Sequence, residues 1–126
     1  PFIRVNAWPT MFGREVTEYS TETPADAEKA DAVFRKMGWV GEWVPDTVGM
    51  VTPRIVSMII NEAWFAFEEK ISTKEEIDRA MKLGTNYPYG PFEWGEKIGI
   101  VRVEKLLEAL HRSDKRYTIA RGLRTK

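Results

Sequence analysis

The 126-residue sequence contains no cysteine and one histidine, and these two scarcities exclude several kinds of site. Without cysteine there is no disulfide scaffold, no thiolate nucleophile and no zinc site with sulfur ligands. One histidine also excludes metal sites built from several imidazoles. No apolar stretch approaches the roughly 18 residues that span a bilayer, and no secretory signal pattern is found. We therefore expect a cytoplasmic protein without a membrane partner.

Charge of one sign is not in excess either, because 19 Lys and Arg residues balance 19 Asp and Glu residues. A zero net charge argues against a nucleic-acid-binding domain, which usually has a basic surface. A hydrophobic content of 43% is typical of a folded chain. The segment 113–126 nevertheless has five basic side chains and one acidic side chain. We expect it to be a loosely ordered, solvated tail, with anion binding as the alternative.

The first third of the sequence predicts a β-α-β unit. Residues 14–19 alternate polar and apolar side chains, as strands do, and residues 39–44 predict a second strand. Between them, Thr23-Pro24 begins a helix that Gly38 ends. Short links favour a parallel strand pair with a right-handed crossover. Two strands do not form a stable sheet alone, and we expect no further strand in this chain.

The middle of the sequence predicts helices. Thr52-Pro53 begins a helix through residue 70 that is apolar on more than one face. This pattern fits either a central helix or a subunit interface. Glu62 lies within it, where a buried carboxylate would need a partner. A capping box at residues 72–75 begins the next helix, which we expect to end at Gly84.

The last part combines a turn-rich linker, residues 86–91, with a short helix that Gly99 ends and a final helix over residues 103–110. No nucleophile–base pair, Gly-rich phosphate loop or metal-ligand spacing is evident. His111 is expected to be a surface residue near a helix end. These patterns alone indicate a helical interaction domain with a fragment of α/β structure.

A more specific signal lies in residues 76–94, EIDRAMKLGTNYPYGPFEW. This run closely resembles the signature of the C-terminal domain of 3-hydroxyacyl-CoA dehydrogenases. Residues 44–50, VPDTVGM, are similar to the junction between the two domains of that family, and Asn61-Glu62-Ala63 fits its long helix. The segment from Asn6 to Val16 resembles the end of its nucleotide-binding domain. The resemblance covers nearly the whole chain before the basic tail.

The resemblance implies a mainly α fold, with a helical domain like the C-terminal domain of 6-phosphogluconate dehydrogenase after a residual β-α-β unit. Residues 1–46 would be the terminal portion of an NAD-binding Rossmann domain. Residues 47–112 would be the helical dimerisation and substrate domain, and 113–126 the basic tail. The chain lacks a G-x-G-x-x-G fingerprint, so NAD is expected in the full-length family member and not on this chain. Pro1 in place of Met leads us to expect a portion of a longer chain.

The resemblance also implies site residues. In the family a His removes the proton of the 3-hydroxyl while hydride passes to NAD, and a Glu orients the His. Glu15 falls on the catalytic Glu position, whereas Ile3 stands at the His position and Pro53 at that of a family Asn. Asn6 matches an Asn near the substrate cleft and is expected to contact substrate. No residue is assigned to a cofactor or a metal.

The function implied is that of the C-terminal portion of a 3-hydroxyacyl-CoA dehydrogenase, which oxidises 3-hydroxyacyl-CoA to 3-oxoacyl-CoA with NAD in fatty acid β-oxidation. The chain alone would be inactive and would serve dimerisation and closure of the acyl-CoA site. Expected partners are a second copy and acyl-CoA. Ile3 and Pro53 leave open a diverged, non-catalytic acyl-CoA-binding or scaffold protein. A helical interaction module of unrelated chemistry is the third possibility.

Overall fold

The computed structural model describes residues 2–125 and confirms a mainly helical fold. By its contacts the chain divides into two compact units, which meet in sequence between Pro53 and Arg54. The sequence-based expectation places the domain boundary earlier, after residue 46.

The first unit is a three-stranded sheet with one helix. Its strands are β1 (Ile3–Val5), β2 (Val16–Thr21) and β3 (Val40–Trp43), in the order β1-β2-β3. A short 3-10 turn (Pro24–Asp26) leads into α1 (Ala27–Lys36), which connects β2 to its parallel neighbour β3. The predicted β-α-β unit is therefore confirmed. The expectation of no further strand is wrong, because β1 pairs antiparallel with β2 and is too short to show an alternation in sequence.

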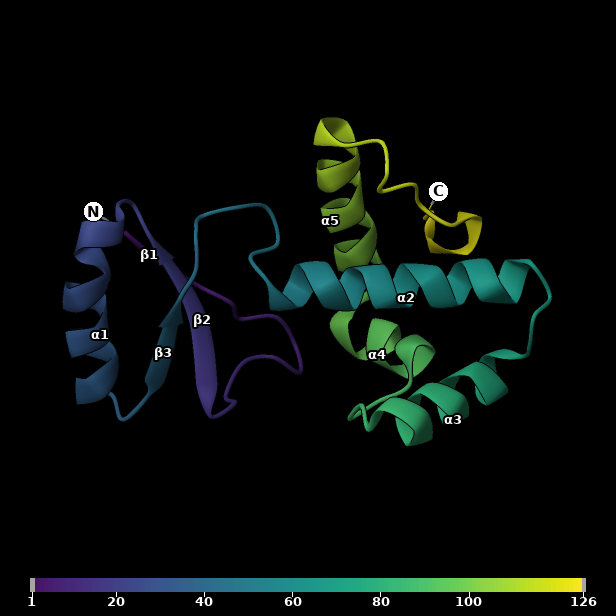
Figure 1. Ribbon diagram of the computed structural model, residues 1–126, viewed down its shortest axis with the longest axis horizontal. Coiled ribbons are helices and arrows are strands. Elements are labelled where there is room, and N and C mark those ends of the chain that lie inside the picture. Colours follow the sequence, from purple (N-terminus) through teal and green to yellow (C-terminus); the bar gives the residue numbers. More distant parts are fainter. Residues whose placement is uncertain (1, 126) are drawn as a thin grey trace. The chain divides into compact units, whose positions relative to one another are not determined.

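Helix α1 covers one face of this sheet (Figure 1). Tyr19, Ala30 and Phe34 form the buried centre of the contact, and the rings of Tyr19 and Phe34 lie 4.7 Å apart. Burial, together with a 2.7 Å hydrogen bond to the Asp31 carboxylate, raises the pKa of the Tyr19 hydroxyl to about 12. A methyl group on Gly41 would lie 2.8 Å from the Tyr19 ring, so this strand position requires glycine.

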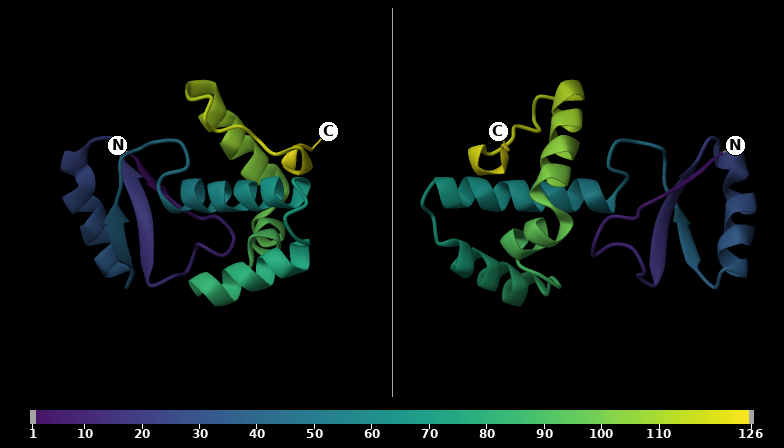
Figure 2. Two further views of the ribbon diagram at one scale, coloured as in Figure 1. Left: turned by 45° about the vertical axis from the view of Figure 1, so that its right-hand side comes forward. Right: turned by 180° about the vertical axis from the view of Figure 1, so that it is seen from behind.

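The second unit is helical. It contains α2 (Thr52–Glu68, with its first two residues in the first unit), α3 (Lys74–Thr85), α4 (Pro91–Ile98), α5 (Ile100–Ser113) and a 3-10 turn, η2 (Arg121–Leu123). Figures 1 and 2 show α5 crossing α2, and α4 connecting α3 to α5. The predicted helices are confirmed. Their shared core is built from apolar side chains of α2, α4 and α5: Val56, Ile60, Phe92, Ile98, Val103 and Leu107.

Three local expectations in this unit need correction. The capping residue of α3 is Thr73, which accepts from the Glu76 backbone N–H, so the capping box lies one residue later than expected. Helix α3 continues past Gly84 and ends where Asn86 takes a left-handed conformation, which asparagine tolerates. Glu62 is exposed and needs no buried partner.

The turn-rich linker 86–90 brings the start of α4 against α3. The Asp78 carboxylate accepts from the backbone N–H groups of Phe92 (2.7 Å) and Glu93 (3.0 Å). Pro91, the first residue of α4, has no N–H to satisfy. A methyl group on Gly90 would lie 2.3 Å from the Asp78 Cβ atom and 2.5 Å from its Cα atom. The run that carries the family resemblance is therefore a close-packed helix–helix joint.

The basic tail is not loosely ordered, contrary to expectation. Its charged side chains are exposed, but Tyr117, Ile119, Ala120 and Leu123 are buried. Residues 114–125, which we call the C-terminal strap, return from α5 and lie along α2 (Figures 1 and 2). The basic composition of the strap agrees with the exposure of its charged side chains. The strap is nevertheless ordered, because its backbone and its apolar side chains make contacts with the rest of the unit.

Polar side chains at seven-residue spacing on α2 hold the strap. Asn61 donates to the Thr118 carbonyl (2.7 Å) and accepts from the Ala120 N–H (2.9 Å). Glu68 accepts from the Gly122 N–H at 2.6 Å. Residues seven apart lie on the same face of a helix, so this face of α2 is committed to the strap. On α5, hydrogen bonds from the Thr125 hydroxyl and N–H keep the pKa of the Glu104 carboxyl below its usual value.

Candidate substrate pocket

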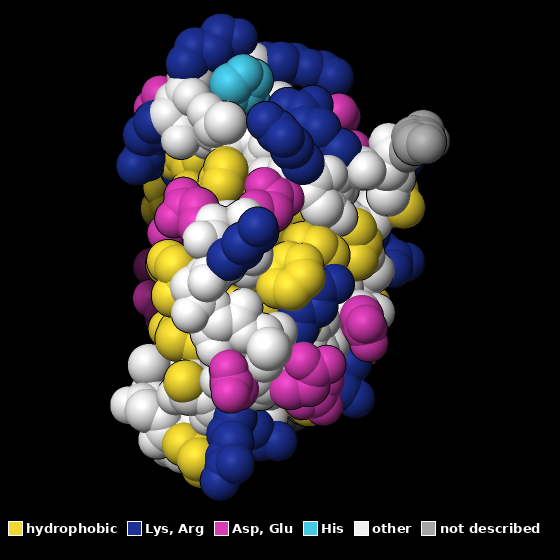
Figure 3. Space-filling view, turned by 90° about the vertical axis from the view of Figure 1, so that its right-hand side faces the viewer, with side chains coloured by type: hydrophobic (Ala, Val, Ile, Leu, Met, Phe, Trp, Pro, Cys, Tyr) yellow, Lys and Arg dark blue, Asp and Glu magenta, His cyan; other side chains and the backbone are white. Residues whose placement is uncertain are grey.

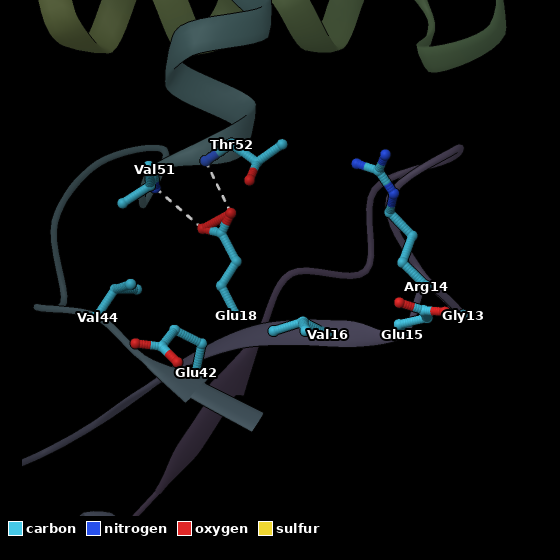
Figure 4. A pocket seen from close by; sticks show the side chains of 9 residues that line it. All are labelled: Gly13, Arg14, Glu15, Val16, Glu18, Glu42, Val44, Val51 and Thr52. Atoms are coloured by element: carbon cyan, nitrogen blue, oxygen red, sulfur yellow. Dashed lines mark hydrogen bonds between the residues drawn. The ribbon is translucent and has the colours of Figure 1, made fainter. Parts of the chain in front are cut away.

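An open pocket of about 810 Å³ lies over the face of the first unit's sheet that α1 leaves uncovered. Side chains alternate between the two faces of a strand, so Val16, Glu18 and Glu42 point away from the α1 side. Figure 4 shows the lining side chains: Gly13, Arg14, Glu15, Val16, Glu18, Glu42, Val44, Val51 and Thr52. Three carboxylates and one guanidinium give the pocket an acidic character.

Glu18 is fixed by the first turn of α2. Its carboxylate accepts from the N–H groups of Val51 (3.0 Å) and Thr52 (2.7 Å), as Figure 4 shows. A carboxylate is favourable at this position, because unpaired N–H groups and the helix dipole make a helix N-terminus positive. Glu18 also stands directly beside Glu42 in the β2–β3 register, and its bonds to α2 offset that like-charge pairing.

The structure does not bring Glu15 and Ile3 together. Glu15 is exposed, lines the pocket and directly precedes the start of β2 at Val16. Ile3 pairs with Thr21 at the other end of that strand. Five residues of extended strand span about 17 Å. A proton-accepting side chain at position 3 would therefore not reach the Glu15 carboxylate in this arrangement.

Asn6 is buried and bonded within its own loop. Its side-chain oxygen accepts from the Trp8 N–H at 3.2 Å, and its amide nitrogen donates to the Met11 sulfur at 3.5 Å. These bonds shape the loop between β1 and β2. Substrate contact by Asn6 stays a prediction, as does the catalytic role of Glu15.

Pro53 is the second residue of α2 and is buried. Proline supplies no N–H, and Glu18 already accepts the N–H groups of the two preceding residues. At the position where the resemblance predicts an Asn, the chain has a residue that helps to begin a helix and has no polar side chain for a substrate.

A dinucleotide does not fit the β2–α1 connection. Such cofactors place their pyrophosphate at a glycine-rich turn before a helix N-terminus. Here the connection is Glu22-Thr23-Pro24-Ala25-Asp26, without glycine and with two acidic residues. The Asp26 carboxylate lies at this helix start and accepts from the Thr23 hydroxyl at 2.8 Å. Negative charge at this end would repel a pyrophosphate.

Outside the pocket, the candidates for chemistry among residues 2–125 are the other acidic side chains and the single histidine. No group of three or more His, Asp or Glu side chains in that range is arranged to hold a metal ion. His111 lies in the last turn of α5, in the second unit, as expected from its place near a helix end. In the same range, no helix has the length and apolar character needed to cross a bilayer.

Comparison with known proteins decides the family. Residues 49–124 match the profile of the family described as 3-hydroxyacyl-CoA dehydrogenase, C-terminal domain. The chain belongs to this family. The 3-hydroxyadipyl-CoA dehydrogenase of Escherichia coli is 38% identical over 111 residues, which are 85% of this chain and 23% of that protein. A probable 3-hydroxybutyryl-CoA dehydrogenase of Bacillus subtilis is 34% identical over 85% of the chain and 37% of its own length.

Solved structures of the family agree with the fold. The crystal structure of 3-hydroxybutyryl-CoA dehydrogenase from Escherichia coli superposes with a TM-score of 0.77 at 35% identity, covering 89% of this chain and 25% of that one. The crystal structure of (S)-3-hydroxybutyryl-CoA dehydrogenase from Ralstonia eutropha superposes with a TM-score of 0.80 at 28% identity. It covers 91% of this chain and 41% of that one. This chain therefore spans well under half the length of these relatives.

Sequence reasoning missed Glu18 and Glu42 as pocket residues. The alternation of Val16, Thr17 and Glu18 places Glu18 on the Val16 side of the strand. That signal could have identified a pocket-facing carboxylate. It could not have identified the partners of Glu18, because Val51 and Thr52 lie more than 30 residues away in sequence.

Proposed function

We propose that this chain is the dimerisation and substrate-closing portion of an NAD-dependent 3-hydroxyacyl-CoA dehydrogenase, and that it does not itself perform the oxidation. Family membership supports the first part. The observation that carries the second is the separation of Ile3 from Glu15 across β2. In this proposal the rest of the enzyme binds NAD, and the enzyme acts on acyl-CoA in cytoplasmic fatty acid oxidation.

The chemistry of the pocket supports this division of roles. Oxidation of a 3-hydroxyl needs a base beside that hydroxyl and a hydride acceptor close to the same carbon. The described pocket offers Glu15 without an imidazole to orient, and Glu18 is already bonded to α2. The β2–α1 connection does not fit the cofactor. A chain with these residues contributes surfaces to the enzyme and lacks the base and the cofactor site that the oxidation needs.

We expect the purified chain to produce no NADH from NAD and 3-hydroxybutyryl-CoA, and we expect Ile3→His to remain equally inactive. The new imidazole would lie at the far end of β2 from Glu15. Absorbance at the NADH band checks both proteins, with an intact family member as the positive control. Turnover by either chain would overturn the proposal.

The alternative is a non-catalytic acyl-CoA-binding or scaffold protein, which Ile3 and Pro53 favour. Fusing the chain to the NAD-binding portion of the Bacillus subtilis relative separates the two possibilities. Turnover by the fusion supports a dehydrogenase portion. Acyl-CoA binding without turnover favours the alternative.

Self-association is proposed to use an apolar groove between α2 and α3. Its walls come from both helices and the start of α4: Ile59, Glu62, Ala63, Ala66, Ile77, Met81 and Pro91. Exposed apolar side chains on the same helices include Ile55 and Leu83, which are 54% and 74% exposed. Contiguous apolar surface of this kind marks interaction sites. The strap occupies another face of α2, so this face is available to a second copy.

We expect Ala66→Glu to shift the chain from dimer to monomer, because a charge would be buried in an apolar interface. Sedimentation velocity over a hundredfold concentration range checks the mass. The matched control is Ala32→Glu, the same change at an exposed position of α1. A concentration-independent monomer mass for the unmodified chain would contradict this proposal.

A further inference from the structure

Two guanidinium groups converge on one hydroxyl in the second unit. Arg54, in the first turn of α2, and Arg116, in the strap, both donate to the hydroxyl oxygen of Tyr117. Both cations also lie near the Tyr117 ring, with Cζ atoms 5.1 Å and 4.4 Å from its centroid. Tyr117 is 2% exposed, so the ring is a fixed support on which the two cations are held.

The positive charge at this point is only partly compensated. Arg116 pairs with Asp114, with 3.0 Å between Nε and Oδ2. Among residues 2–125, no carboxylate lies within 4.0 Å of the Arg54 guanidinium. Arg54 is half-buried, and buried charges are normally paired. Residues 111–116 add Arg112, Lys115 and the single His, with Asp114 as the sole acidic residue of that segment.

The same three side chains have further donors that no described residue accepts from. The Tyr117 oxygen accepts from both arginines, and within the described residues no group accepts its own proton. Each guanidinium also has N–H groups beyond the one directed at Tyr117. Unused donors on neighbouring side chains, next to the Arg54 cation that no described carboxylate pairs with, favour an anion with several oxygens.

We propose that Arg54, Arg116 and Tyr117 bind a phosphate group, and that this group belongs to the CoA portion of the substrate. Guanidinium groups bind phosphate oxygens in paired, charge-assisted hydrogen bonds. The identity of the ligand rests on the proposed function: CoA carries a 3′-phosphate and a diphosphate. The side chain of Arg116 is 65% exposed, so a phosphate can reach it from solvent.

The surroundings favour such a ligand. Figure 3 shows Lys and Arg side chains gathered at the upper end of the face it presents. Charges of one sign around a site raise the local concentration of a counter-charged ligand and speed its association. The pocket of the first unit, lined by three carboxylates, has the opposite character. The chemistry of the two sites is therefore distinct.

The test titrates the complete chain with inorganic phosphate, CoA and dephospho-CoA by calorimetry. Arg116→Gln removes an exposed cation, and we expect the dissociation constant for CoA to rise roughly tenfold. Tyr117→Phe keeps the ring, removes the hydroxyl and is expected to give a smaller rise. The matched control is Arg112→Gln, the same charge change in the last turn of α5 without a contact to Tyr117.

Each result of the titrations either supports or overturns a stated part of the proposal. A loss in Arg116→Gln that Arg112→Gln does not share supports the site, and weaker binding of dephospho-CoA then identifies the 3′-phosphate. Equal binding of dephospho-CoA identifies the diphosphate. Unchanged CoA binding by Arg116→Gln, or an equal loss in Arg112→Gln, overturns the site while acyl-CoA binding stands. If inorganic phosphate binds at these residues and CoA binds no more tightly, the site stands and the proposed function fails.

Discussion

Replacing Gly90 with alanine is expected to destabilise the chain by roughly 3 kcal/mol, near the upper end for a small-to-large change in a packed site. The added methyl group would lie 2.3 Å from the Asp78 Cβ atom and 2.5 Å from its Cα atom. A flexible side-chain end could move aside, but a Cα atom moves only with its helix. Helix α3 and the start of α4 would have to separate.

Separation of these helices would also break the cap of α4. The Asp78 carboxylate holds the Phe92 and Glu93 N–H groups only because Gly90 lets the backbone approach so closely. A side-chain cap contributes about 1 kcal/mol to a helix, and this one is charged. Gly90→Ala is therefore expected to lower the stability of the chain in two ways, through the steric clash and through the broken cap.

Urea denaturation followed by circular dichroism measures the effect, with Gly84→Ala as the control. Gly84 lies inside α3, and a methyl group there would meet nothing within 4 Å. Alanine is favoured over glycine in a helix interior by about 0.5–1 kcal/mol, so the control should gain stability. Equal midpoints for Gly90→Ala and the unmodified chain would contradict the close packing described for this joint.

The joint also shows what the sequence could and could not reveal. The turn-rich linker 86–91 and the start of α4 at Pro91 follow from local chemistry, because proline suits the first turn of a helix. The contact of Asp78 with the backbone of Phe92 does not follow from local chemistry, because 14 residues separate the two in sequence. The run that carried the family resemblance was informative because it encodes this packing.

The β-α-β unit was predictable because alternation, a proline-led helix start and Gly38 all agree locally. Strand β1 was not predictable, because three residues are too few to establish a period. At the candidate site, the resemblance supplied Glu15, Ile3 and Pro53 as positions along the chain. The placement of Glu15 and Ile3 at opposite ends of β2 depends on strand register, which sequence patterns specify weakly in short strands.

The order of the C-terminal strap is the feature that differs most from the sequence-based prediction, and particular residues explain why. Basic composition suggested solvation, and the apolar positions 117, 119 and 123 are too few to establish a helical or a strand period. The decisive partner is Asn61, a polar residue in the middle of an apolar helix, 57 and 59 residues from the groups it binds. A buried asparagine in such a helix indicates an unmet backbone donor or acceptor nearby, without saying which one.

Asn61→Leu is accordingly expected to cost about 2–3 kcal/mol, because it leaves the buried Ala120 N–H and the Thr118 carbonyl without partners. Leucine has a similar volume, so loss of packing contributes little. Arg121 and Arg124 already have exposed side chains. Release of the strap should free the backbone beside them, so that trypsin can cleave there. Mass spectrometry of a digestion time course then reports strap release separately from the global unfolding measured in urea.

Ser57→Ala provides the comparison on the same helix. Ser57 is fully buried and its hydroxyl has no hydrogen-bond partner, so its removal should leave stability unchanged or slightly raised. Both variants thus remove a polar group from the interior of α2. Of these two residues, only Asn61 bonds to the strap. Faster cleavage in Asn61→Leu alone shows that the bonds of Asn61 are needed to hold the strap. Equal cleavage in both variants would mean that the apolar contacts of Tyr117, Ile119 and Leu123 suffice to hold it.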